Sequence, residues 1–152
     1  MRSSLKYMVG AEMRELQNVL QDMAREVYTH LGSGFDESIY QSAFAYELRQ
    51  RGFHFQREVN IEIFYKGIPL GLGRPDFIIR PCTVGALHIE KPIIVELKAV
   101  DRLNDNHRAQ LRAYLISIKH SSDLELRTCI GGFLINFPKN HREPEIVPIL
   151  DT

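Results

Sequence analysis

The segment "PIIVELKAV", residues 92–100, constrains the fold more than any other part of this chain. Its dense β-branched and aliphatic side chains predict a buried strand. Because side chains alternate across a strand, one face is purely apolar while the other carries Glu96 and Lys98. The charges have two readings. They are either solvated or ion-paired on a half-exposed strand, at less than about 1 kcal/mol, or they belong to a functional site.

Helices are predicted on both sides of this strand. An apolar stripe at steps of three and four predicts a helix over residues 12–31. A second helix begins near residues 33–36, and Gly52 stands where its C-terminal cap would fall. The segment "DRLNDNHRAQLRAYLISI" has helical spacing, with two aspartates and Asn104 available as caps.

Further strands are predicted before and after "PIIVELKAV". Residues 53–80 alternate with period two around the turn "YKGIPLG", which indicates a hairpin or meander. Residues 81–91 are interpreted as a loop or short extra strand, and "TCIGGFLINF" as a last buried strand. We expect one domain over residues 1–152, with its core at about 33–137 and a tail at 138–152 that adds at most an edge strand.

Composition excludes several classes of protein. Hydrophobic residues make up 44% of the chain and charged residues 25%, without an apolar run near the roughly 18 residues of a membrane span. The first ten residues lack the apolar region of a secretion signal. Cys82 and Cys129 do not form a zinc-binding pattern, and they favour a reducing compartment. We therefore expect a cytoplasmic protein that contacts no membrane.

The segment "GLGRPDFIIR" supplies a second carboxylate. Asp76 begins a short strand, and neighbouring strands tend to pair, so Asp76 and Glu96 are expected to converge. Two close carboxylates repel unless a hard cation such as Mg²⁺ lies between them. Lys98 would then stand beside the cation and offset charge on a phosphodiester. In the alternative reading, Asp76 only caps the turn.

These motifs carry a resemblance to a known family. "PD" at residues 75–76 and "ELK" at 96–98 resemble the signature of the PD-(D/E)XK nuclease superfamily. "GFDESIY" has the spacing GxxExxY and "QLRAY" the spacing QxxxY, an order similar to that of RecB-type exonucleases. Over residues 20–148 the chain is similar to the small bacterial GxxExxY protein family, which is grouped in that superfamily.

The resemblance implies a restriction-endonuclease-like α/β core of helix, three-stranded meander, helix and strand, with a central mixed β-sheet flanked by helices. It implies that Mg²⁺, with Mn²⁺ able to substitute, is bound by Asp76, Glu96 and Glu37. Lys98 would be the catalytic lysine. Gln110 and Tyr114 would lie near the site and bind substrate.

Several of these residues also have simpler, purely structural explanations. Glu37 also suits the positive end of a helix dipole, and the tyrosines also suit an apolar core. His107 is a candidate phosphate contact or general base, although a histidine in a polar first turn is common. Arg74 either binds a phosphate or pairs with Asp76.

The leading function is a metal-dependent nuclease that hydrolyses DNA with a metal-activated water. One alternative is a nucleic-acid-binding or complex-forming protein with little turnover, and another is a hydrolase of a different phosphate ester. Lys plus Arg and Asp plus Glu both number 19, so DNA binding must rest on a local basic patch. The segment "PCTVGALHIE" is expected to form an added hairpin or a lip over the site. Association into a homodimer stays open.

Overall fold

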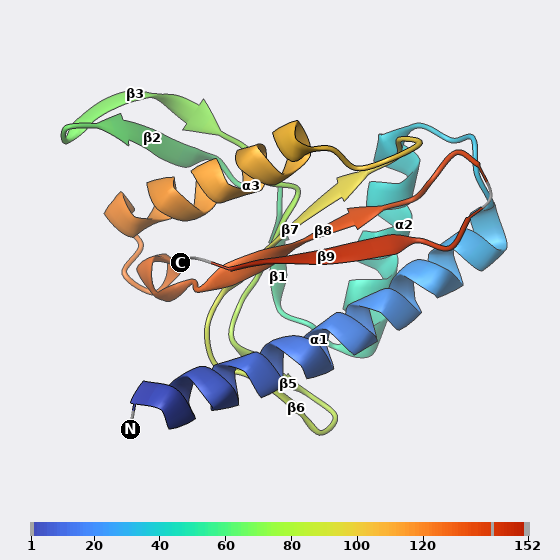
Figure 1. Ribbon diagram of the computed structural model, residues 1–152, viewed down its shortest axis with the longest axis horizontal. Helices are drawn as coiled ribbons and strands as arrows, with labels where there is room; N and C mark the ends of the chain where they lie inside the picture. Colours follow the sequence, from blue (N-terminus) through green and yellow to red (C-terminus); the bar gives the residue numbers. More distant parts are fainter. Residues whose placement is uncertain (1, 141, 151–152) are drawn as a thin grey trace.

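The computed structural model describes residues 2–140 and 142–150, with side chains from residue 10 onward, and it is built around a five-stranded sheet (Figure 1). The strands of this sheet are β1 (Phe55–Arg57), β4 (Phe77–Ile79), β7 (Ile93–Lys98), β8 (Gly131–Asn136) and β9 (Glu145–Leu150). They lie in the order β1-β4-β7-β8-β9.

Strand pairing reproduces the predicted order of meander, helix and strand. Strands β1, β4 and β7 pair antiparallel in succession. Helix α3 (Asp105–Ser117) then connects β7 to β8, and these two strands are parallel. Strand β9 pairs antiparallel with β8 as the edge strand expected from the tail. The sheet is therefore mixed, with its three most buried strands, β4, β7 and β8, side by side at its centre.

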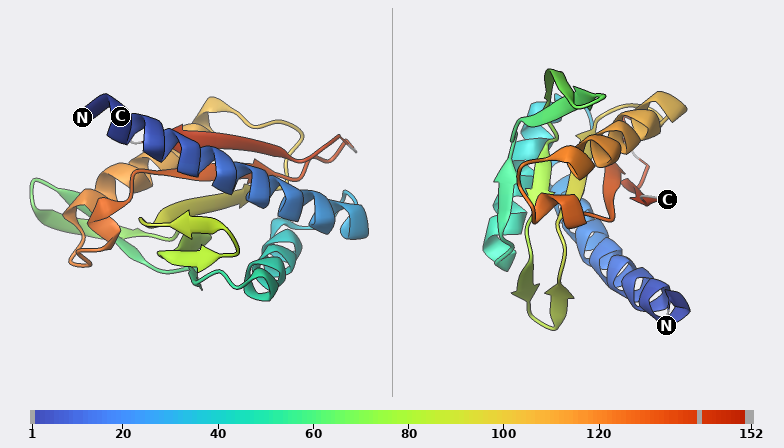
Figure 2. Two further views of the ribbon diagram at one scale, coloured as in Figure 1. Left: turned by 90° about the horizontal axis from the view of Figure 1, so that it is seen from below. Right: turned by 90° about the vertical axis from the view of Figure 1, so that its left-hand side faces the viewer.

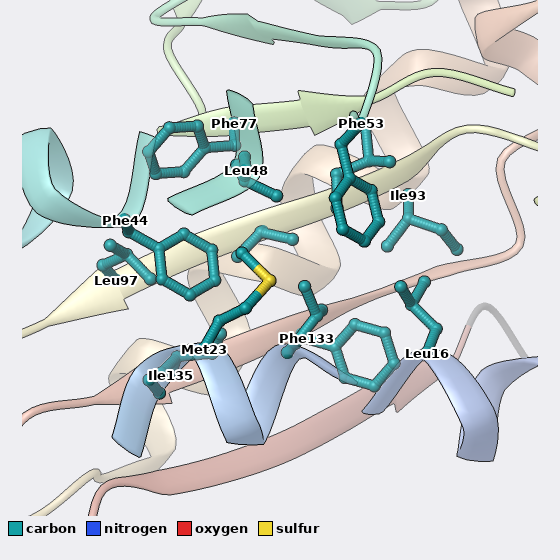
Figure 3. Close-up of a cluster of buried hydrophobic side chains, with 14 of the residues drawn as sticks. Leu16, Met23, Phe44, Leu48, Phe53, Phe77, Ile93, Leu97, Phe133 and Ile135 are labelled. Carbon is teal, nitrogen blue, oxygen red and sulfur yellow. The ribbon is translucent and has the colours of Figure 1, made fainter. Parts of the chain in front are cut away.

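Helices cover both faces of the sheet. Helices α1 (Arg2–Leu31) and α2 (Glu37–Arg51) pack on one face, where Met23 and Phe44 join Phe133 in one apolar cluster (Figure 3). Helix α3 and two short 3₁₀ helices, η1 (Ile118–His120) and η2 (Leu126–Thr128), pack on the other. Since all of β7 except Lys98 is buried, the reading of a half-exposed strand is wrong.

The helix boundaries partly match the sequence patterns. Helix α1 begins at Arg2, well before the expected residue 12. Among the described side chains, Met13 is the first buried one on this helix, so the apolar stripe marks where packing starts rather than where the helix starts. Helix α2 ends as predicted at Gly52, whose left-handed backbone, φ 88°, suits a glycine C-cap.

Two hairpins lie outside the main sheet (Figure 2). The strands β2 (Ile61–Tyr65) and β3 (Ile68–Gly73) pack beside α3 and lead into Asp76. The strands β5 (Cys82–Val84) and β6 (Leu87–Ile89) form the added hairpin, which packs against α1. The alternative prediction, that this segment forms a lip over the site, is wrong. Asp76 lies just before the start of β4 and the hairpin follows its end, so the two are at opposite ends of this strand.

Candidate active site

The register of two central strands brings Asp76 and Glu96 together. Phe77 of β4 lies opposite Val95 of β7, so the residue before β4 adjoins Glu96. The backbone N–H of Asp76 donates a 2.7 Å hydrogen bond to Glu96 Oε1. The backbone N–H of Leu97 donates a 2.8 Å bond to Asp76 Oδ2. The predicted convergence is confirmed, and the two side chains are called the carboxylate pair below.

Burial makes the negative charge of this pair costly. Glu96 is only 4% exposed, and burial, followed by the Asp76 charge, raises its pKa to about 8. Burial also raises the pKa of Asp76 to about 6, opposed by the Leu97 hydrogen bond. Lys98 lowers both pKa values, although less than burial raises them. Near neutral pH the metal-free pair therefore favours keeping a proton, and a cation could take the place of that proton.

Glu37 reaches the carboxylate pair through a residue that the sequence analysis missed. Gln41 Nε2 donates to Asp76 Oδ1 at 3.0 Å and to Glu37 Oε1 at 3.3 Å. Glu37 and Gln41 are four residues apart on α2 and so share a helix face. That spacing was the available signal, but glutamine is a common surface residue, and only the fold places Asp76 in front of it.

Lys98 is joined to the QxxxY motif of α3. Its ammonium donates to Gln110 Oε1, and Gln110 Nε2 donates to Tyr114 Oη, both at 3.4 Å. These bonds are at the long limit and therefore weak. Burial raises the pKa of Tyr114, as does the charge of Glu96 nearby. Lys98, at the end of β7, is thus linked to Gln110 directly and to Tyr114 only through Gln110.

The lack of a side chain at Gly73 of β3 leaves room for the ring of Tyr114. A Cβ atom on this glycine would come within 2.7 Å of Tyr114 Cε1. The tyrosine ring therefore packs directly on the backbone of the β2–β3 hairpin. A larger residue at position 73 would push the ring away from the site.

The other two candidates make structural contacts. His107 forms a capping box with Asn104, in which the Asn104 N–H donates to His107 Nδ1 at 3.1 Å. Burial and the charge of Lys98 lower the pKa of His107. With Nδ1 accepting this bond, Nε2 carries the ring proton and suits a phosphate contact better than a general base. Arg74 pairs with the Glu58 carboxylate at 3.1 Å, not with Asp76.

The donor set fits a hard cation with few protein ligands. Within residues 2–140 and 142–150, no group of three or more His, Cys, Asp or Glu side chains is arranged to hold a metal ion. Mg²⁺ is, however, commonly held by one or two carboxylates, with waters as the other ligands. The carboxylate pair, with Glu96 buried and Asp76 half-buried, suits this arrangement because Lys98 offsets its negative charge only in part. A ligand role for Glu37 stays a prediction, because Gln41 stands between it and Asp76.

The fold and this site define a restriction-endonuclease-like α/β protein. The profile of the PD-(D/E)XK nuclease superfamily matches residues 14–148, and the chain belongs to this superfamily. Members of this nuclease superfamily generally use divalent metal ions. No helix among the described residues is long and apolar enough to cross a membrane.

Similarity to a solved structure supports the fold. The protein in the crystal structure of SSO0001 has a TM-score of 0.51 and 23% identity to this chain. The match covers 75% of this chain and 50% of SSO0001, so the chain spans about half the length of that protein. No curated protein matches the chain. At this level of identity the likeness concerns the fold alone.

Proposed function

We propose that this chain is a metal-dependent nuclease that hydrolyses DNA phosphodiester bonds, and that it belongs to the GxxExxY group of its superfamily. One observation carries the proposal: a carboxylate pair, with Glu96 buried and Asp76 half-buried, lies at the end of β7 that also presents Lys98. Buried carboxylates without a cation cost stability and repel phosphates. A protein that only binds nucleic acid has no use for them.

Each residue has a role in this proposal. Asp76 and Glu96 hold Mg²⁺ or Mn²⁺, with Glu37 as a further acidic group at the same site. When bound, the cation supplies an activated water and offsets charge on the phosphate. Lys98, half-buried at the end of β7, would add positive charge beside the reacting phosphodiester and would help to orient the attacking water.

DNA would lie over the N-terminal end of α3. Gln110 and Tyr114 would contact the DNA strand beside Lys98, and the Nε2–H of His107 would donate to a neighbouring DNA phosphate. Arg74, with its side chain 63% exposed, can exchange Glu58 for a phosphate. Because the net charge is zero, binding rests on this local surface and is expected to be weak and salt-sensitive.

Incubation of supercoiled and linear DNA with Mg²⁺ or Mn²⁺ tests the function. The wild type should cleave, whereas Asp76→Ala and Lys98→Ala should not. Equal cleavage by all three proteins would indicate a contaminating nuclease. Binding of Mn²⁺ without cleavage would favour a complex-forming protein, and hydrolysis of a small phosphodiester but not of DNA would favour another ester as substrate.

We also propose that the chain is one domain that works in the cytoplasm. Both cysteines are free thiols, which suits a reducing compartment. A homodimer would place two sites on the two strands of a duplex. Light scattering on the purified protein with and without DNA would give its mass and decide this point.

A further inference from the structure

Gln41 occupies the space between two acidic side chains of the candidate site. Its Nε2 lies 3.0 Å from Asp76 Oδ1 and 3.3 Å from Glu37 Oε1. A primary amide has two N–H groups, so one side chain can donate to both carboxylates at once. Gln41 is half-buried one turn after Glu37. Its contacts therefore join α2 to the loop that enters β4.

These bonds complete the fixation of Asp76. Its Oδ1 accepts from Gln41 and its Oδ2 accepts from the Leu97 N–H at 2.8 Å. Both oxygens thus have a donor, one from a helix and one from a central strand. A neutral donor to two anions holds them near each other without adding charge. Hydrogen bonds to ionised groups are also stronger than those between neutral groups.

We propose that Gln41 is a positioning residue that holds Glu37 and Asp76 side by side, and that it thereby sets the affinity of the site for a divalent cation. This inference rests on one part of the proposed function, namely that the divalent cation binds at these carboxylates. Side chains that orient metal ligands are typically worth about 10- to 100-fold in metal affinity. Gln41 acts through the carboxylates and contacts no substrate.

The test is Mn²⁺ titration of the full chain by isothermal calorimetry. Gln41→Met keeps the length of the side chain but removes both donors, and Gln41→Asn keeps an amide too short to reach both carboxylates. Each should weaken Mn²⁺ binding about 10-fold or more. Gln50→Met is the matched control, because Gln50 is an exposed residue near the end of the same helix, and it should bind Mn²⁺ like the wild type.

A double-mutant cycle separates positioning from a general structural effect. In a Glu37→Gln background, Gln41→Met should weaken Mn²⁺ binding much less than it does in the wild type. An equal fold-change in both backgrounds would overturn the proposal. So would wild-type affinity in both Gln41 variants, or a wild type that binds no Mn²⁺ at millimolar concentration.

The outcomes also distinguish this inference from the nuclease proposal. Cleavage of DNA by the wild type, with unchanged Mn²⁺ affinity in the Gln41 variants, would overturn the inference alone. A wild type that binds Mn²⁺ with the expected dependence on Gln41, yet leaves DNA intact, would overturn the nuclease proposal alone. Thermal unfolding in EDTA identifies any variant that fails to fold, and the other Gln41 variant then decides.

Discussion

Glu96→Gln should stabilise the metal-free protein at alkaline pH, although it removes a carboxylate from the centre of the candidate site. Glu96 is 4% exposed, and its ionised form lies beside Asp76. A glutamine at this position keeps an oxygen that can accept the Asp76 N–H bond now made at 2.7 Å. The substitution therefore removes a buried charge while preserving the local hydrogen bond.

The expected magnitude follows from the raised pKa of Glu96. Burial, followed by the Asp76 charge, raises the pKa of this carboxyl from its ordinary 4.5 to about 8 in the folded protein. A raised carboxyl pKa gives stability that is fully present below the unfolded pKa and is lost as pH rises through the folded pKa. Each pKa unit corresponds to about 1.4 kcal/mol. Allowing for relaxation around the charge, we expect Glu96→Gln to gain about 2 kcal/mol at pH 9.

Urea and thermal unfolding in EDTA at pH 5, 7 and 9 would measure this gain. Little difference between variant and wild type is expected at pH 5, and a rise in Tm of about 4–8 °C at pH 9. The exposed residue Glu62, changed to Gln, is the control and should show no such trend. A gain independent of pH, or none at pH 9, would refute the electrostatic reasoning.

Three further predictions concern Lys98, Gly73 and α3. Lys98→Met should reduce DNA cleavage at least about 100-fold while leaving the affinity for Mn²⁺ within a few-fold of the wild type. DNA nicking assays and calorimetry in parallel would measure the two quantities. Loss of Mn²⁺ binding in this variant would contradict a role of Lys98 in the chemical step. Gly73→Ala should lower the free energy of unfolding in urea by about 1–3 kcal/mol, because the new Cβ would clash with Tyr114. Gly71→Ala on the same strand is the control, since its Cβ would meet nothing within 4 Å. Equal losses in the two variants would rule out the clash. Asn104→Ala should lower the free energy of unfolding by about 1 kcal/mol through loss of the α3 cap, and an unchanged value would show that the capping box adds nothing.

The sequence by itself determined most of the helices and strands and the apolar faces that form the core. Apolar steps of three and four marked the packed part of α1, and alternation marked β7 as the strand with a charged face. Gly52 marked the end of α2, whereas the start of α3 was left open among three capping residues, of which the structure selects Asn104. These signals are local, because each depends on residues within a few turns of one another.

Local patterns also located much of the site. The residues "PD" immediately precede β4 and "ELK" ends β7, and the antiparallel pairing of these neighbouring strands brings their carboxylates together. The start of α1 was missed, because its first turns extend beyond the apolar stripe that the sequence pattern detects. The place of the β5–β6 hairpin was also missed, since the direction of β4 decides which end of the sheet an insertion occupies.

Only the tertiary structure decided how the polar side chains are used. Gln41 contacts Asp76 and Arg74 pairs with Glu58, each across a separation of 16 or more residues in the sequence. The raised pKa of Glu96 likewise depends on burial by helices packed on both faces of β7. A hydrophobic pattern specifies which face of an element is buried. The partner of a polar group depends instead on orientation and distance, which are set only when the helices and strands have packed.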